Sequence, residues 1–467
     1  MSLPPSPSLL DQTLRAVARR YRLPPLSAAS VLSGQASPAT ILAIAIEQAG
    51  AAVARGETPD AALKRRFIDA LARMIREAMR AQAGDPAFQA MVLRHRAPLV
   101  REYASLSAHA GRDRRQVHAA VNAIAHPAKR QRISHDRQRV ALARLHAAAS
   151  SASWSELQDA ARCLLAMPEA ANAAPFAPNL ARLPDNAALE RLRRLEALAS
   201  NDLVRQYRSL WNRNGPPSGS SAAVAQGAAS QRRGAAVEAA AARAIEALAR
   251  RLNESEQDPA LYRVATSMRV PASIPGSPER AKSEWDVVLL RRAETGGEAA
   301  WDICLLVEVK ASVDAATTDL PRLLRGLRLL SQADPDTVYP FETREGTVLL
   351  RGASLGALTT DEAGLAGTVL YCSDAPAETG QRPLGAASRM QLLSAPASLE
   401  FASALAGRRH ADPHSLEPVW HELLESPRWD AVLRQHPMLR QVRELMVHTD
   451  DLLAAVESAA GSRPGLG

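Results

Sequence analysis

The sequence predicts a multidomain protein of the α plus β class, with an all-α N-terminal domain, an αβ domain and C-terminal helices. Its 467 residues exceed the roughly 100–200 residues of one ordinary domain. Alanine and arginine are abundant and aromatic residues make up only 4%, which favours helices over most of the length. Apolar runs rich in β-branched residues gather between residues 261 and 373, so we expect the sheet there.

Composition divides the chain into four parts. Residues 1–213 contain successive segments with helical spacing and form the expected basic all-helical domain. Residues 214–233 are dominated by small and turn-forming side chains, which is typical of a flexible linker. Residues 234–374 hold the predicted αβ domain, and residues 375–467 form a C-terminal helical extension.

Positive charge is concentrated in the N-terminal half. Residues 1–214 hold 31 Lys and Arg against 17 Asp and Glu, whereas residues 215–467 hold 26 against 32. Such an excess is typical of nucleic-acid binding, because cationic side chains that neutralise phosphates release counterions. An anionic membrane surface, an acidic protein or a merely solvated basic face would fit the charge as well. The candidate phosphate contacts in the most basic window are Lys129, Arg130, Arg132, Arg137 and Arg139.

Several other classes of protein lack support in the sequence. The long uncharged run near the N-terminus is interrupted by prolines and serines, so we expect no membrane span. The first residues also lack the basic and apolar regions of a secretory signal, which favours a soluble cytoplasmic protein. Phosphate-binding loops of the G-x-x-x-x-G-K-[ST] type, dinucleotide fingerprints and G-x-S-x-G elbows do not occur in the sequence.

Two apolar strands with unusual charges form the most informative stretch. Residues 283–290 and 301–310 are separated by a polar segment with Gly296 and Gly297, which predicts a hairpin. Glu308 and Lys310 are two residues apart and share one face of their strand. If the hairpin is symmetric about Gly297, Asp286 stands opposite Glu308, roughly 5 Å away at Cβ. Two carboxylates that close repel each other, and a hard divalent cation is the natural group between them.

The elements around this hairpin add further candidates. A helix over residues 234–252 carries Glu238 on its apolar stripe, and a strand is expected at residues 261–270. A helix over residues 317–332 is expected to be capped by Thr318 or Asp319, and strands are expected at residues 346–352 and 367–373. One side of the second helix carries three arginines that either contact phosphates or form a solvated face. These are Arg322, Arg325 and Arg328.

This order of elements resembles the core of the PD-(D/E)XK nuclease superfamily, the restriction-endonuclease-like fold with a central mixed sheet. The resemblance covers residues 234–374 only, and Trp285 stands where the family name has proline. It implies that Asp286, Glu308 and the carbonyl of Val309 hold a catalytic Mg²⁺ or Mn²⁺. It also implies that Lys310 positions or activates the attacking water, and that Glu238 joins the metal site or supports it.

Two other acids compete for roles near the hairpin. Asp302 shares the face of Glu308 but lies six residues away, roughly 20 Å along a strand, too far for one metal. Glu284 is nearer and can pair with Lys310 instead. A metal-dependent nuclease that hydrolyses phosphodiester bonds, with DNA preferred to RNA, is the leading hypothesis. The alternatives are a catalytically inactive nuclease-like module that binds nucleic acid or protein, a mainly helical scaffold, and a hairpin with a solvated charged face.

Overall fold

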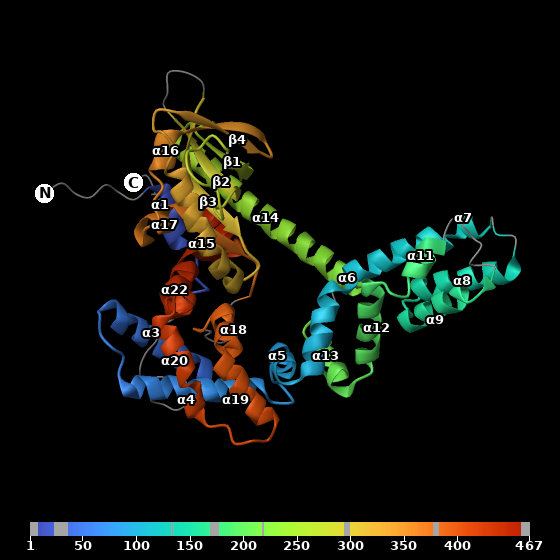
Figure 1. The fold of residues 1–467 in the computed structure, drawn as a ribbon. Helices are drawn as coiled ribbons and strands as arrows, with labels where there is room; N and C mark the ends of the chain where they lie inside the picture. The colour runs from blue at the N-terminus through green and yellow to red at the C-terminus, as the bar shows by residue number, and fades with distance from the viewer. Residues whose placement is uncertain are drawn as a thin grey trace, which may run out of the picture. The chain divides into compact units, whose positions relative to one another are not determined.

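A computed structural model describes most of the chain, and Figure 1 labels its elements. The described residues are 8–22, 36–131, 133, 135–168, 177–216, 219–293, 299–376 and 383–458. The chain forms two compact units. The first unit comprises residues 1–74, 219–393 and 413–467, and the second comprises residues 75–218 and 394–412.

Helices make up most of both units. Up to the sheet the helices are α1 (Leu9–Ala16), α3 (Pro38–Ala54), α4 (Ala61–Ala78), α5 (Pro86–Arg96), α6 (Pro98–Ala125), α7 (Pro127–Arg130), α8 (Asp136–Ser150), α9 (Trp154–Leu165), α11 (Ala177–Arg182), α12 (Ala187–Ala199), α13 (Asp202–Arg213) and α14 (Ser221–Glu256). Later helices are α15 (Val313–Leu330), α16 (Gly352–Gly356), α17 (Glu362–Thr368), α18 (Ala386–Ser394), α19 (Pro396–Ala406), η1 (Pro413–Leu416), α20 (Glu417–Glu425), η2 (Pro427–Trp429), α21 (Asp430–Leu433), α22 (Gln435–Leu445) and α23 (Thr449–Ser458).

The strands lie in the first unit and form one mixed sheet. They are β1 (Tyr262–Arg269), β2 (Glu284–Arg292), β3 (Trp301–Val309), β4 (Val338–Thr343), β5 (Gly346–Arg351), β6 (Val369–Ser373) and β7 (Met446–His448). Their order is β2-β1-β4-β5-β3-β6-β7, and β2 also pairs with β3. Five strands therefore close into a ring, from which β6 and β7 extend in parallel with β3.

The β4–β5 hairpin closes this ring by bridging β1 and β3. Its turn is fixed to β1 by the Glu345 carboxylate, which accepts hydrogen bonds from the amide and the hydroxyl of Thr266 at 2.8 and 2.6 Å. The amide of Arg344 donates to the Thr266 carbonyl at 3.0 Å. At the other end, Leu350 of β5 pairs with Trp301 of β3. The closure thus rests on a few long-range contacts that a local sequence pattern does not encode.

The α plus β composition and the mixed sheet are confirmed, but the expected restriction-endonuclease-like sheet is not what the chain forms. The predicted strands at 261–270, 283–290, 301–310, 346–352 and 367–373 correspond to β1, β2, β3, β5 and β6. The strands β4 and β7 were not predicted. Because β4 and β5 insert between α15 and β6 and reach back to β1, the sheet closes on itself.

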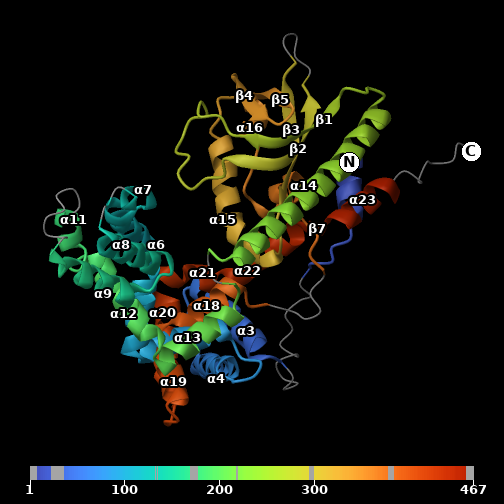
Figure 2. The same cartoon turned by 90° about the vertical axis from the view of Figure 1, so that its right-hand side faces the viewer.

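Helices cover two faces of the strands. The apolar stripe of α14, including Ile245 and Leu248, packs with Val287 and Val307 of the hairpin in one buried cluster. The other cluster joins Leu306 and its neighbours in the hairpin to α15 and α22. Figure 2 shows α14 and α15 on either side of β2 and β3, with α23 beside α14. The ends of β2 and β3 are therefore held between two helix layers.

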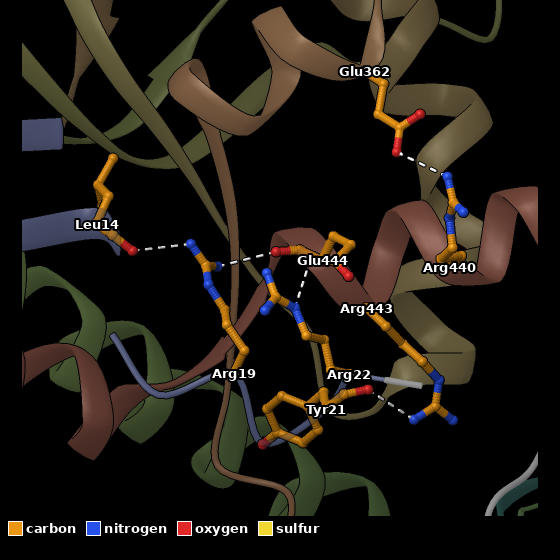
Figure 3. Close-up of polar contacts among 8 residues, drawn as sticks. All are labelled: Leu14, Arg19, Tyr21, Arg22, Glu362, Arg440, Arg443 and Glu444. Carbon is orange, nitrogen blue, oxygen red and sulfur yellow. Dashed lines mark hydrogen bonds and ion pairs between the residues drawn. The ribbon is translucent and has the colours of Figure 1, made fainter. Parts of the chain in front are cut away.

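The N-terminal segment belongs to the unit that holds the sheet, contrary to the predicted boundaries at 1–213. Leu14 and Val17 are buried in the α14 cluster. Figure 3 shows Arg443 of α22 donating to the Tyr21 carbonyl, and Arg19 donating to the carbonyls of Leu14 and Glu444, all at 3.0 Å. Contacts between residues more than 400 positions apart cannot be found from local composition, which is why this assignment was missed.

The C-terminal part also departs from the predicted boundaries. The predicted extension at 375–467 contributes β7, which pairs with β6, and α22, which packs in the α15 cluster. Residues 394–412, with α19, belong instead to the second unit. The expected helical extension is thus divided between both units.

Two helix starts differ from expectation because of local capping. The predicted linker at 214–233 is helical from Ser221, since Ser220 caps α14 and the following alanines have high helix propensity. Helix α15 begins before the expected cap, because the Ser312 side chain accepts a hydrogen bond from the Ala315 amide. Asp319 therefore lies inside α15, where its carboxylate is available to the neighbouring strands.

The second unit is helical throughout its described residues. One buried cluster joins α6, α8, α9, α11 and α12, with Trp154 and Leu157 among its members. A smaller cluster joins α5, α6 and α13. Within the described parts of both units, no helix is apolar enough over sufficient length to cross a membrane.

Candidate active site at the end of the β2–β3 hairpin

The β2–β3 hairpin has the register that the sequence predicts at the end that carries Asp286 and Glu308. Val287 pairs with Val307 and Leu289 with Leu305, as expected for symmetry about Gly297. Beyond Leu289 the register shifts at a bulge, and the predicted turn at 294–298 lies outside the described residues. Continuing the register by one residue from Val287 brings Asp286 opposite Glu308.

Asp286 and Glu308 meet at this end of the two strands. The Asp286 carboxylate accepts a hydrogen bond of 2.7 Å from the Val309 amide, which ties β2 to the residue that follows Glu308. Glu308 is fully buried, and its Oε2 atom faces two ammonium groups. Lys282 Nζ lies 2.5 Å away and Lys310 Nζ lies 3.1 Å away.

Lys310 is held from the helix side as well. Its Nζ atom lies 3.5 Å from Asp319 Oδ2 on α15, and that oxygen accepts a hydrogen bond of 3.3 Å from the Tyr371 hydroxyl. The Lys310 side chain keeps 18% of its surface exposed, whereas Glu308 keeps none. Lys310 is therefore more exposed than Glu308 and slightly more exposed than Asp319, whose side chain keeps 12% of its surface exposed, and both carboxylates contact its ammonium group.

The pKa values of Glu308 and Lys310 are both raised, for different reasons. Desolvation, followed by the charge of Asp286, raises the pKa of Glu308 to about 7, while Lys282 and Lys310 act to lower it. Burial alone would lower the pKa of Lys310. The charges of Glu308, Asp319 and Asp286 together outweigh burial and raise the pKa of Lys310 above its ordinary value. Lys310 is thus a stable cation at neutral pH.

Glu238 lies near this group without joining it. The residue is half-buried on α14, and Arg344 from the β4–β5 turn lies 3.5 Å from its carboxylate. Burial, together with the charge of Asp286, raises the pKa of Glu238. The predicted inward orientation is thus only partial, and the ion pair with Arg344 gives this carboxylate a partner of its own.

The two competing acids have partners elsewhere. Arg351 forms a two-pronged ion pair with Asp302, with 2.8 Å between Nε and Oδ1. Glu284 lies 3.7 Å from Arg269 on β1, so its expected alternative pairing with Lys310 does not occur. Neither Asp302 nor Glu284 therefore belongs to the group of carboxylates around Lys310.

The oxygen donors at this position fit a divalent cation such as Mg²⁺ in part. Asp286, Glu308 and the Val309 carbonyl are hard oxygen ligands, and Glu308 Oε1 is buried without a hydrogen-bond partner. In the described residues, however, no three His, Cys, Asp or Glu side chains gather closely enough to hold a metal ion. Mg²⁺ commonly uses one or two carboxylates and takes its other ligands from water and phosphate, so two carboxylates suffice for that chemistry.

The predicted phosphate contacts are placed in two different regions. On α15, Arg322, Arg325 and Arg328 are exposed, and Arg325 donates to the Arg280 carbonyl at 2.9 Å. They therefore lie on the solvent side of the helix that supplies Asp319.

The residues of the basic window belong to the second unit. Lys129 donates to the Ala123 carbonyl at 2.6 Å, and Arg130 is half-buried. Arg137 and Arg139 are exposed on α8, where Arg139 pairs with Asp136. Arg132 lies outside the described residues.

Three members of the site were missed by sequence reasoning. Lys282 precedes β2 in an irregular segment with no periodic pattern, and Asp319 was expected to cap a helix. Tyr371 lies in an apolar strand, where a tyrosine is ordinarily a core residue. The chain holds only four lysines, and in space two of them contact Glu308. The rarity of lysine was therefore the sequence feature that pointed to Lys282.

Comparison of the chain with family models, curated proteins and solved structures gives no significant match.

Proposed function

We propose that this chain is a divalent-metal-dependent nuclease of the PD-(D/E)XK type that hydrolyses phosphodiester bonds, with DNA preferred to RNA. The observation that carries the proposal is the meeting of Asp286, Glu308 and Lys310 at one end of the β2–β3 hairpin. Their spacing in the sequence was the basis for the resemblance, and their contacts in space are what such a site requires. The closed five-stranded ring differs from the restriction-endonuclease-like sheet that the resemblance implies.

Each residue has a role that follows from its surroundings. Asp286, Glu308 and the Val309 carbonyl would hold Mg²⁺ or Mn²⁺, and the bound cation would supply a Lewis acid to the phosphate and the attacking water. Lys310, charged and partly exposed, would offset negative charge on the phosphate and orient the water. The exposed arginines of α15 and the basic window of the second unit would contact the nucleic-acid backbone.

A binding module without catalysis is the second candidate. It is favoured by the ion pair of 2.5 Å between Lys282 and Glu308, which already supplies a cation to the carboxylate. A module of this kind would bind nucleic acid in a salt-dependent manner and leave it intact.

Cleavage assays with the full chain separate the two candidates. We expect cleavage of DNA in the presence of Mg²⁺ or Mn²⁺, and its loss in Asp286→Ala and Lys310→Ala. Asp302→Asn is the matched control, because that carboxylate lies at the opposite end of β3 from Glu308 and pairs with Arg351. Cleavage that survives in both site variants would reject the assigned residues, and salt-sensitive binding without cleavage would favour the binding module.

A further inference from the structure

Lys282 is a buried cation that the nuclease motif does not include. Its side chain is 5% exposed and that of Glu308 is 0% exposed, and 2.5 Å separates Nζ from Oε2. The ammonium also lies 5.6 Å from the centre of the Trp285 ring. A lysine is rarely buried to this degree unless it is paired, so Glu308 is the partner that keeps it there.

Helix α15 and the loop before β2, which carries Lys282, lie in close contact. A Cβ atom added at Gly326 would lie 2.7 Å from Lys282 Cβ and 3.2 Å from its backbone nitrogen, so glycine allows the close approach. Arg325, the neighbouring residue on α15, donates to the Arg280 carbonyl at 2.9 Å and fixes the loop that carries Lys282. The backbone around Lys282 is therefore held in place by α15, and its buried ammonium has a position fixed by the fold.

The two lysines beside Glu308 are not equivalent. Lys310 is 18% exposed and shares Asp319, so it can reach a bound phosphate. Lys282 has no comparable exposure and acts on the site only through Glu308. Asp286, Glu308 and Asp319 are the carboxylates around the two lysines, so Lys282 and Lys310 cancel much of the negative charge that a divalent cation would meet. Glu308 Oε1 is the oxygen of that carboxylate without a hydrogen-bond partner.

We propose that Lys282 is a positioning residue that holds Glu308 in place and competes with the divalent cation for its carboxylate. In the free protein this competition weakens metal binding. A phosphate of the nucleic acid adds negative charge beside the two lysines, so metal and phosphate bind together more tightly than either binds alone. This inference rests on the proposed metal site, and it concerns a residue outside the motif that defines it.

The test is a titration of the full-length protein with Mn²⁺, followed by calorimetry or by the electron-spin signal of free Mn²⁺. Lys282→Met keeps the aliphatic stem over Trp285 and removes the charge. We expect Mn²⁺ to bind this variant at least tenfold more tightly than the wild type when no nucleic acid is present. Arg250→Met, which removes one exposed charge from α14, is the matched control and should leave Mn²⁺ affinity unchanged.

Gly326→Ala provides a second route, because it displaces Lys282 without changing the charge of the chain. It should also tighten Mn²⁺ binding. If circular dichroism shows that Lys282→Met does not fold, Gly326→Ala is the variant that tests the role of Lys282. Equal or weaker Mn²⁺ binding in the folded variants overturns the role of Lys282, even if Asp286→Ala abolishes cleavage and the nuclease proposal stands. Tighter binding without any cleavage would support the role of Lys282 and count against the nuclease.

Discussion

Replacing Asp319 with asparagine tests whether α15 controls the charge of Lys310. The ammonium lies 3.5 Å from the Asp319 carboxylate, and the two side chains are only 18% and 12% exposed. A contact between charged groups this well shielded is worth about 1.5–3 kcal/mol. Because Asp319 is one of the carboxylates that raise the pKa of Lys310, the Lys310 ammonium should become more acidic in the variant.

The sign of this effect follows from the charges around Lys310. Burial alone would lower the pKa of Lys310, and the carboxylates, Asp319 among them, raise it. Because the folded state raises the pKa, Lys310 contributes stability at neutral pH that is lost as pH rises through the folded pKa. Asp319→Asn removes one of these negative charges and lowers the folded pKa, so the loss should be smaller and complete at a lower pH in the variant.

Lysine side-chain NMR measures this directly, because the chain has only four lysines. The Lys310 signal is assigned as the one missing in Lys310→Met, and its titration is compared between wild type and Asp319→Asn. Asp314→Asn is the control, since the Asp314 carboxylate accepts a hydrogen bond from the Ala386 amide at 3.2 Å instead. An unchanged titration of Lys310 in Asp319→Asn would refute the coupling, whatever the activity of the protein.

Three further substitutions test contacts within each unit separately. Asp113→Ala should lower the free energy of unfolding by about 1.5–3 kcal/mol at pH 7 in urea titrations, because it removes a buried carboxylate bonded to Arg191. Arg191 holds the pKa of Asp113 below its ordinary value, so the difference should persist above about pH 4 and vanish in stronger acid. Glu345→Ala should cost about 1 kcal/mol and speed hydrogen exchange at the Thr266 amide, because it detaches the β4–β5 turn from β1. Leu248→Ala should cost about 2–5 kcal/mol by opening a cavity between α14 and the sheet, and a cost below 1 kcal/mol would contradict the burial of this side chain.

The hairpin was the part of the fold that local sequence determined best. Its register follows from alternation and from the position of the turn, so the pairing of Val287 with Val307 was predictable. The strand β4 was missed because Pro340 within it argues against a central strand. The closure of the sheet depends on single pairings such as Trp301 with Leu350, which no periodic pattern reveals.

The candidate site shows the same division between local and distant information. Glu308 and Lys310 are two residues apart, and their shared face follows from strand geometry alone. Lys282 comes from a loop, and its burial depends on Gly326 of a later helix, so its role required the three-dimensional contacts. Glu238 lies on the apolar stripe of α14, which the sequence shows, but its pairing with Arg344 depends on the hairpin that closes the ring.

The energetics of Glu308 bear on why this arrangement exists in the chain. A buried ion pair costs desolvation for both partners, and apolar side chains of similar size are often equally or more stabilising. Glu308 has no exposed surface, an unpaired Oε1 and a pKa raised to about 7 by burial and by Asp286. The sheet would be expected to gain stability from a leucine with packed neighbours at this position. A carboxylate kept here at such a cost, beside a partly exposed lysine and a second acid, is typical of a site that binds or reacts.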